Sequence, residues 1–140
     1  MSRYVVDASV VLKWYVPEIH AAEACLYADP SHELLAPDLV VPEVGNALWK
    51  KMRRGEISRG QVETAARFLK VSSLIIAPSG SILEEAMDIA SKYDRAVYDS
   101  LYLALAVARD CPLVTADRKL FNAMQPTPFA RRVRWVETAP

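Results

Sequence analysis

Residues 4–15 of this 140-residue chain read Y-V-V-D-A-S-V-V-L-K-W-Y, and this stretch decides the class of fold. The apolar run Tyr4–Val6 predicts a short buried strand, which ends at Asp7. A short helix is expected to follow over residues 9–15, closed by Pro17. A buried strand that leads at once into a helix is typical of a parallel sheet covered by helices.

The same alternation of strand and helix continues along the rest of the chain. Apolar runs predict further strands at residues 34–36, 74–76 and 112–114, and an edge strand at residues 134–136. Helices are expected at residues 18–28, 38–54, 58–71, 81–93, 99–109 and 118–124, with Asp38 and Ser58 as the N-caps of two of them. Nothing marks a domain boundary, so we expect a single α/β domain over residues 1–140, built as three α/β/α layers.

Composition excludes several classes of protein. The chain has 17 basic and 17 acidic residues, so its net charge gives no hint of a nucleic-acid partner. Cys25 and Cys111 belong to no Cys/His cluster, which excludes a zinc ribbon and predicts two reduced thiols. The N-terminal apolar run is too short for a signal peptide, and residues 101–108 fall well short of the roughly 20 apolar residues that span a bilayer. We therefore expect a cytoplasmic protein with no membrane segment.

Two aspartates follow directly after expected strands. Asp7 ends the first strand, and Asp117 lies just beyond the strand at residues 112–114. Ligands of open parallel sheets bind outside the carboxyl ends of the strands. These two carboxylates are therefore candidates for one shared site.

Two further acids occur in unusually apolar surroundings. Asp99 opens a helix whose neighbours are nearly all apolar, and Glu43 is flanked by Val41, Pro42 and Val44. Burying such a carboxylate is costly unless it is paired or bound to a metal. From position alone, an N-cap role for Asp99 and a solvated surface role for Glu43 stay open.

A cluster of carboxylates predicts a site for a hard cation. Oxygen ligands suit Mg²⁺ or Mn²⁺, and no His/Cys constellation offers zinc an alternative. Like charges repel one another, so such a cluster needs a cation or a proton to persist. A bound Mg²⁺ could orient a scissile phosphate and lower the pKa of an attacking water.

Four segments together resemble the PIN-domain nucleases, most closely the VapC toxins of prokaryotic toxin–antitoxin pairs. They occur in the family's order over essentially the whole chain, and they are V-D-A-S-V at residues 6–10, P-E-V-G-N-A-L at 42–48, Y-D-S-L-Y-L-A-L-A at 98–106 and L-V-T-A-D at 113–117. The resemblance implies a parallel five-stranded sheet flanked by helices and Mg²⁺- or Mn²⁺-dependent cleavage of RNA. It also implies a cognate antitoxin and a homodimer as partners.

The resemblance carries roles to particular residues. Asp7, Glu43, Asp99 and Asp117 match the family's catalytic, metal-binding acids. Ser9, Asn46 and Thr115 match polar positions beside them, where they would hydrogen-bond carboxylates or water. Basic side chains near these segments are the expected contacts to RNA phosphates, namely Lys50, Arg54, Arg118 and Lys119. Tyr98 and Tyr102 are expected mainly in the core or at an interface.

The sequence also bears on functions other than that of a nuclease. No G-x-S-x-G elbow and no glycine-rich phosphate loop is present, which disfavours a serine hydrolase and a nucleotide-binding fold. A phospho-acceptor domain would need an aspartate after the third strand, where Ala77 and Pro78 stand instead. A non-catalytic RNA- or protein-binding PIN-like domain, and an RNA-processing nuclease outside any toxin pair, stay open.

Overall fold

A five-stranded parallel sheet forms the centre of the molecule, as expected from the sequence. The computed structural model describes residues 2–140. The strands lie in the order β3-β2-β1-β4-β5, and every neighbouring pair is parallel. Their bounds are β1 Ser2–Val6, β2 His32–Pro37, β3 Ile75–Ala77, β4 Leu113–Thr115 and β5 Val133–Trp135.

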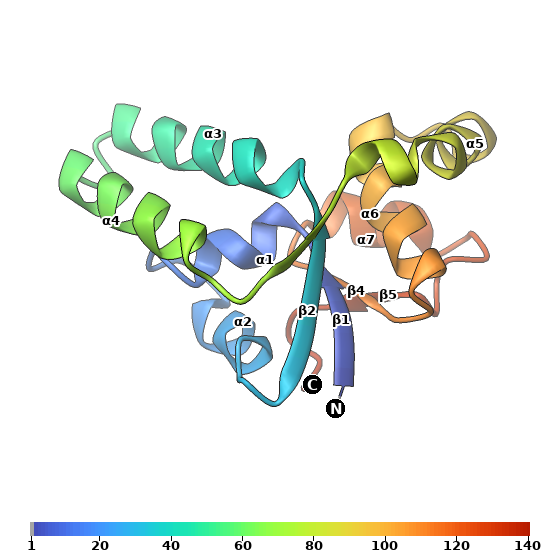
Figure 1. Cartoon of the computed structure of the whole chain (residues 1–140), viewed down its shortest axis with the longest axis horizontal. Helices are drawn as coiled ribbons and strands as arrows, with labels where there is room; N and C mark the ends of the chain where they lie inside the picture. Colours follow the sequence, from blue (N-terminus) through green and yellow to red (C-terminus); the bar gives the residue numbers. More distant parts are fainter. Residues whose placement is uncertain (1) are drawn as a thin grey trace.

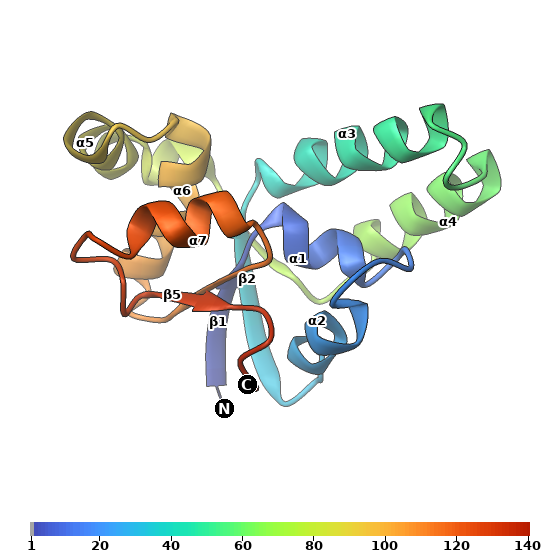
Figure 2. The ribbon, with the colours of Figure 1, turned by 180° about the vertical axis from the view of Figure 1, so that it is seen from behind.

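The helices form two groups on opposite sides of this sheet. Figures 1 and 2 show α1 to α4 on one side and α5 to α7 on the other, which gives the expected three layers. The helices are α1 Ala8–Lys13, α2 Ala21–Tyr27, α3 Val40–Arg53, α4 Arg59–Lys70, α5 Leu83–Tyr93, α6 Val97–Ala108 and α7 Arg118–Met124, with a short 3₁₀ turn at Ser79–Ser81. None of these helices is both long and apolar enough to cross a membrane.

The central strand β1 lies in the core and borders the point where the strand order of the sheet reverses, called the topological switch point. Val5 and Val6 are fully buried and pair with Leu113 and Val114 of β4. After β1 the chain places β2 and then β3 on one side of it. The chain then crosses back and places β4 and β5 on the other side of β1. Such a reversal opens a crevice at the carboxyl ends of the two strands between which it occurs. Here those strands are β1 and β4, which end beside Asp7 and Asp117.

Some expected boundaries were wrong by a few residues, and three of them change the role of an acid. Helix α1 begins at Ala8, so Asp7 is its N-cap. Helix α3 begins at Val40 after Leu39, and the Asp38 carboxylate instead accepts a hydrogen bond from the Ser79 N–H across the β2–β3 edge. Helix α6 begins at Val97, which makes Asp99 a residue of its first turn and not its N-cap.

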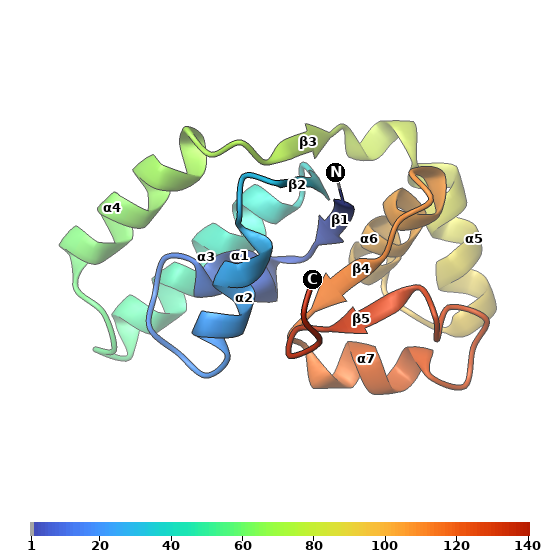
Figure 3. The ribbon, with the colours of Figure 1, turned by 90° about the horizontal axis from the view of Figure 1, so that it is seen from below.

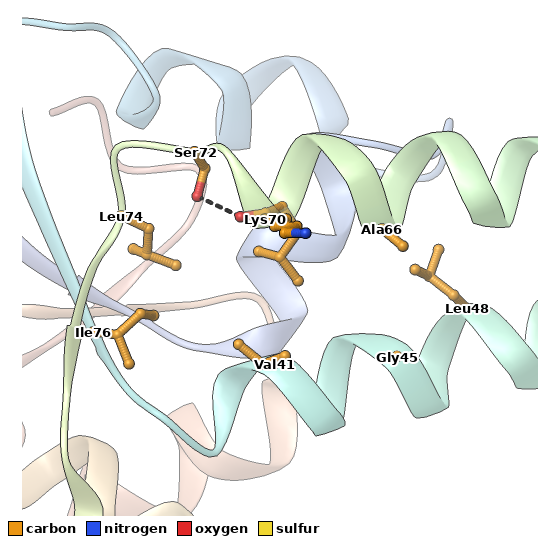
Figure 4. Close-up of a pocket in the computed structure, with 9 residues that line it drawn as sticks. Val41, Gly45, Leu48, Ala66, Lys70, Ser72, Leu74 and Ile76 are labelled. Carbon is orange, nitrogen blue, oxygen red and sulfur yellow. Dashed lines mark hydrogen bonds between the residues drawn. The ribbon is translucent and has the colours of Figure 1, made fainter.

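Helices α3 and α4 extend beyond the sheet as a pair joined by a tight turn (Figure 3). Between them and β3 lies an open groove of about 400 Å³, shown in Figure 4. Its lining is mainly apolar and comprises Val41, Gly45, Leu48, Ala66, Leu69, Lys70, Ser72, Leu74 and Ile76. The outer surface of this helix pair also exposes Trp49 and Phe68.

Candidate active site

The four acids singled out in the sequence line one small pocket at the carboxyl edge of the sheet. Asp7 comes from the end of β1, Glu43 from α3, Asp99 from α6 and Asp117 from the start of α7. Ala8, Ser9 and Tyr102 complete the lining of this pocket, whose volume is about 80 Å³. We call it the acidic pocket. Four segments that are distant in the sequence thus meet at the switch point between β1 and β4.

Asp7 is the most deeply held of the four carboxylates. Its side chain is buried and accepts hydrogen bonds from the Ser9 hydroxyl, the Thr115 hydroxyl and the Val10 N–H. Both hydroxyls are themselves held by backbone donors. The Ala116 N–H donates to Ser9 Oγ at 2.9 Å, and the Asp117 N–H donates to Thr115 Oγ1 at 3.0 Å. Ser9 and Thr115 therefore join the ends of β1 and β4 around one carboxylate.

Burial dominates the electrostatics of Asp7. Desolvation raises its pKa from 3.8 to about 6, although the hydrogen bonds from Ser9, Thr115 and Val10 lower it. The negative charge of Asp117 adds to the rise. An ionised carboxylate is thus held where neither solvent nor a cationic side chain compensates its charge.

Glu43 faces the pocket from the first turn of α3. Its carboxylate accepts a hydrogen bond from the Tyr102 hydroxyl at 2.5 Å. Partial burial raises the pKa of Glu43, the bond from Tyr102 lowers it, and the charge of Asp99 raises it. Pro42, beside Glu43, is accommodated because a proline in the first turn of a helix lacks only an N–H that would have no partner within the helix.

Asp99 and Asp117 are more accessible to solvent. Arg95 donates from Nη2 to Asp99 Oδ2 at 2.7 Å, and both side chains are partly exposed. Asp117 is exposed and is the N-cap of α7, accepting from the Lys119 N–H at 3.0 Å. The pocket therefore has a buried side at Asp7 and an open side at Asp117.

The donor set of the acidic pocket fits a hard divalent cation. Every charged group that lines it is a carboxylate, and two of the four have raised pKa values to which a neighbouring carboxylate contributes. A cation would relieve that repulsion. The oxygens do not converge as tightly as in a closed cage, because within residues 2–140 only His20, Glu23 and Glu137 bring three ligand atoms within 4.8 Å of one another. A hard divalent cation that binds one or two carboxylates and keeps several waters suits this looser arrangement.

The remaining predicted residues lie outside the acidic pocket. Asn46 is exposed one turn beyond Glu43 on α3, and its role stays a prediction. Lys50 and Arg54 line a separate hollow with Trp49 and Arg53 at the far end of α3, about 10 to 16 Å along the helix axis from Glu43.

Arg118 and Lys119 lie closer to the acids, in the first turn of α7. Both side chains are exposed, and Asp117 precedes them directly. The Arg118 guanidinium stacks 3.7 Å from the centre of the Trp135 ring and also faces Phe121. This stacking holds the guanidinium over the Trp135 ring, while the Arg118 backbone directly follows Asp117 of the acidic pocket.

Sequence reasoning missed two residues of the site, Tyr102 and Arg95. The ring of Tyr102 is buried as expected, but its hydroxyl reaches into the acidic pocket. Arg95 precedes α6 and reaches Asp99 from four residues away. The signal for Tyr102 was its spacing, because residues three apart on a helix share a face and Asp99 stands three positions earlier.

The pKa of Asp7 predicts how stability depends on pH in metal-free solution. Below about pH 4 the carboxyl is protonated in both the folded and the unfolded chain, so its ionisation does not lower the free energy of unfolding. Between pH 4 and 6 only the unfolded chain releases the proton, and stability falls as pH rises. Replacing Asp7→Asn removes this loss, so at pH 7 in EDTA the variant should be more stable than the parent by about 1–3 kcal/mol, after allowing for one weakened hydrogen bond.

Urea unfolding of both proteins between pH 4 and pH 8 measures this difference. Asp88→Asn, which changes an exposed aspartate of α5, is the matched control and should follow the parent throughout. A gap between the parent and Asp7→Asn that is the same at pH 4 and pH 7 would contradict the assignment.

Comparison with known proteins places this chain in a family. The model of the PIN domain matches residues 4–125. Ribonuclease VapC3 of Pyrobaculum aerophilum is 35% identical over 122 residues, which cover 84% of this chain and 92% of that protein.

Solved structures agree with this match. The crystal structure of PAE2754 from Pyrobaculum aerophilum superposes with a TM-score of 0.70 at 27% identity, covering 98% of this chain and 91% of that one. A chain of a toxin–antitoxin complex from Klebsiella pneumoniae shares the fold with a TM-score of 0.61 at 14% identity, covering 94% of this chain and 95% of that one. On the extent of the family match and its agreement with the observed fold, the chain belongs to the PIN domain family.

Proposed function

We propose that this chain is a divalent-metal-dependent endoribonuclease that hydrolyses phosphodiester bonds of RNA, and that it acts as the toxin of a toxin–antitoxin pair. The observation that carries the proposal is the meeting of Asp7, Glu43, Asp99 and Asp117 in one pocket at the switch point of the sheet. The relative named ribonuclease VapC3 supports RNA as the substrate class.

The cation that best suits this pocket is Mg²⁺ or Mn²⁺. Asp7, Glu43, Asp99 and Asp117 would hold it, directly or through water. When bound, such an ion neutralises charge on the scissile phosphate and makes a water molecule more acidic. Asp7 is positioned for this role before any ion arrives, because the Ser9 and Thr115 hydroxyls fix both of its oxygens.

Water is the proposed nucleophile, because the protein groups of the pocket are otherwise engaged. The Ser9 hydroxyl donates to Asp7 and accepts from the Ala116 N–H, so it is committed on both sides. The Tyr102 hydroxyl donates to Glu43. No cysteine or histidine lines the pocket. Attack by water on phosphorus, with departure of one ribose oxygen that takes up a proton, balances the reaction as a hydrolysis.

Two basic surfaces are proposed to hold the RNA backbone. Arg118 and Lys119 flank the open side of the acidic pocket. Lys50 and Arg54 lie further along α3, in a hollow that Trp49 and Arg53 share and that no acid lines. A strand bound at the pocket would meet the first pair near the scissile phosphate and the second pair some nucleotides away.

Partner proteins complete the proposal. A cognate antitoxin would hold the enzyme inactive by filling the cleft above the acids. Self-association as a homodimer is also proposed, supported by the apolar groove between α3 and α4 and by the exposed Trp49 and Phe68.

Cleavage of RNA with purified protein tests the enzyme itself. The parent should cut a structured RNA with Mg²⁺ or Mn²⁺ and lose activity in EDTA. Asp99→Asn should lower kcat at least about 100-fold, since several kcal/mol of charge stabilisation depend on the metal site. Asp88→Asn, a matched exposed aspartate, should cleave like the parent. Cleavage that is unaffected by EDTA and by Asp99→Asn would refute the proposal.

The salt dependence of RNA binding tests the basic contacts. In an Asp99→Asn background without divalent cation, Lys50→Ala, Arg54→Ala, Arg118→Ala and Lys119→Ala should each flatten the plot of log K against log salt by about 0.7–1. Arg59→Ala removes an exposed cation that is paired with Glu63 on α4, and it should leave the slope unchanged. If all five variants keep the slope of the Asp99→Asn background protein, RNA binds elsewhere.

Co-expression tests the toxin role. Induction of the parent should arrest growth, and induction of Asp99→Asn should not. The product of the adjacent gene, made together with the parent, should restore growth and inhibit cleavage by purified protein in proportion to its concentration. An RNA-processing nuclease outside a toxin pair would cleave RNA but neither arrest growth nor respond to that neighbour.

A further inference from the structure

Helix α6 delivers two different groups to the acidic pocket. Asp99 and Tyr102 are three positions apart in Val97–Ala108, so their side chains leave the helix on the same face. Asp99 faces the open side, where Arg95 reaches it. Tyr102 is 2% exposed, with its ring among the core residues and its hydroxyl at the pocket wall. A buried tyrosine hydroxyl needs a hydrogen-bonding partner, and this one has Glu43.

The single proton of the Tyr102 hydroxyl is committed to Glu43. The hydroxyl donates to Glu43 Oε1 at 2.5 Å. A tyrosine hydroxyl carries one proton, and in this bond that proton is directed at the Glu43 carboxylate. The phenol thus joins α6 to α3 across the acidic pocket.

This bond fixes a side chain that would otherwise be free to turn away. Glutamate has three side-chain torsions, and Glu43 lies only half-buried on α3, across the pocket from α6. The negative charge of Asp99 repels it, and no lysine or arginine forms an ion pair with it among residues 2–140. The Tyr102 hydroxyl is the one side-chain donor recorded on Glu43 within the described chain. Oε1 is held in this way, and Oε2 accepts no side-chain hydrogen bond within residues 2–140.

We propose that Tyr102 is a positioning residue, which holds Glu43 toward Asp99 so that the acidic pocket is ready to take up a divalent cation. The inference rests on the proposed function, since it concerns the same site. It assigns Tyr102 no contact with RNA or with the reacting atoms.

Direct measurement of Mn²⁺ binding by electron paramagnetic resonance tests this inference without any turnover. Tyr102→Phe keeps the ring and removes only the hydroxyl, and it should weaken Mn²⁺ binding about 10-fold or more, as loss of a partner behind a metal ligand commonly does. Tyr98→Phe is the matched control, because Tyr98 lies on the same helix with 62% of its surface exposed. It should bind Mn²⁺ like the parent.

A double-mutant cycle shows whether Tyr102 acts through Glu43. Glu43→Gln alone should also weaken Mn²⁺ binding, and adding Tyr102→Phe to it should cause little further loss. In cleavage assays, a high concentration of Mn²⁺ should restore most of the activity of Tyr102→Phe. Unfolding in EDTA, followed by circular dichroism, separates any general loss of stability from the change in metal affinity.

The outcomes separate this inference from the proposed function. A parent that binds Mn²⁺ while Tyr102→Phe binds it equally well overturns the role of Tyr102 and leaves the metal-dependent nuclease standing. A tenfold loss that is just as large in the Glu43→Gln background also overturns it, because Tyr102 would then act by another route. A parent that neither binds Mn²⁺ nor cleaves RNA overturns the proposed function and this inference together.

Discussion

The burial of the Asp7 carboxylate at the end of the central strand is the constraint on which the rest of the site depends. Strand β1 must be apolar to fill the middle of a sheet covered on both sides, and its fully buried Val5 and Val6 meet that need. The next residue is a charge that remains buried. Two hydroxyls, from Ser9 and Thr115, hydrogen-bond to that charge but do not neutralise it. Burial therefore raises the pKa of Asp7 and leaves a site that favours a cation.

The same two hydroxyls explain why the site sits where the sheet changes direction. Ser9 belongs to the helix that leaves β1, and Thr115 ends β4, the strand beside it. Each hydroxyl accepts a hydrogen bond from a backbone N–H of the segment after β4, and each donates a hydrogen bond to Asp7. The ends of the two strands are thereby fixed around one carboxylate, and Asp117 follows within the same loop. A crevice that the strand order creates is turned into a set of oriented oxygens.

The outer half of the site is built by helices from opposite sides of the sheet. Glu43 comes from α3 and Asp99 from α6, which lie in the two different helical groups of Figures 1 and 2. Like charges brought together from separate elements have no intrinsic reason to stay close. Arg95 holds Asp99, and Tyr102 holds Glu43, each by one short hydrogen bond. The match to the PIN domain family covers residues 4–125, a range that contains all four of these acids.

The sequence by itself determined the order of strands and helices and marked Asp7 and Asp117, because strand periodicity and the ends of parallel strands are local features. It also marked Glu43 and Asp99 as acids in apolar surroundings, and the family motifs joined all four. Only the tertiary structure decided that Tyr102 lines the same pocket, that Arg95 pairs with its Asp99, and that Lys50 and Arg54 lie apart from it. Local patterns encode which face of a helix a residue occupies, but not what that face meets. The partner of a buried hydroxyl or carboxylate is set by how helices pack across the sheet, and that arrangement exists only in the folded chain.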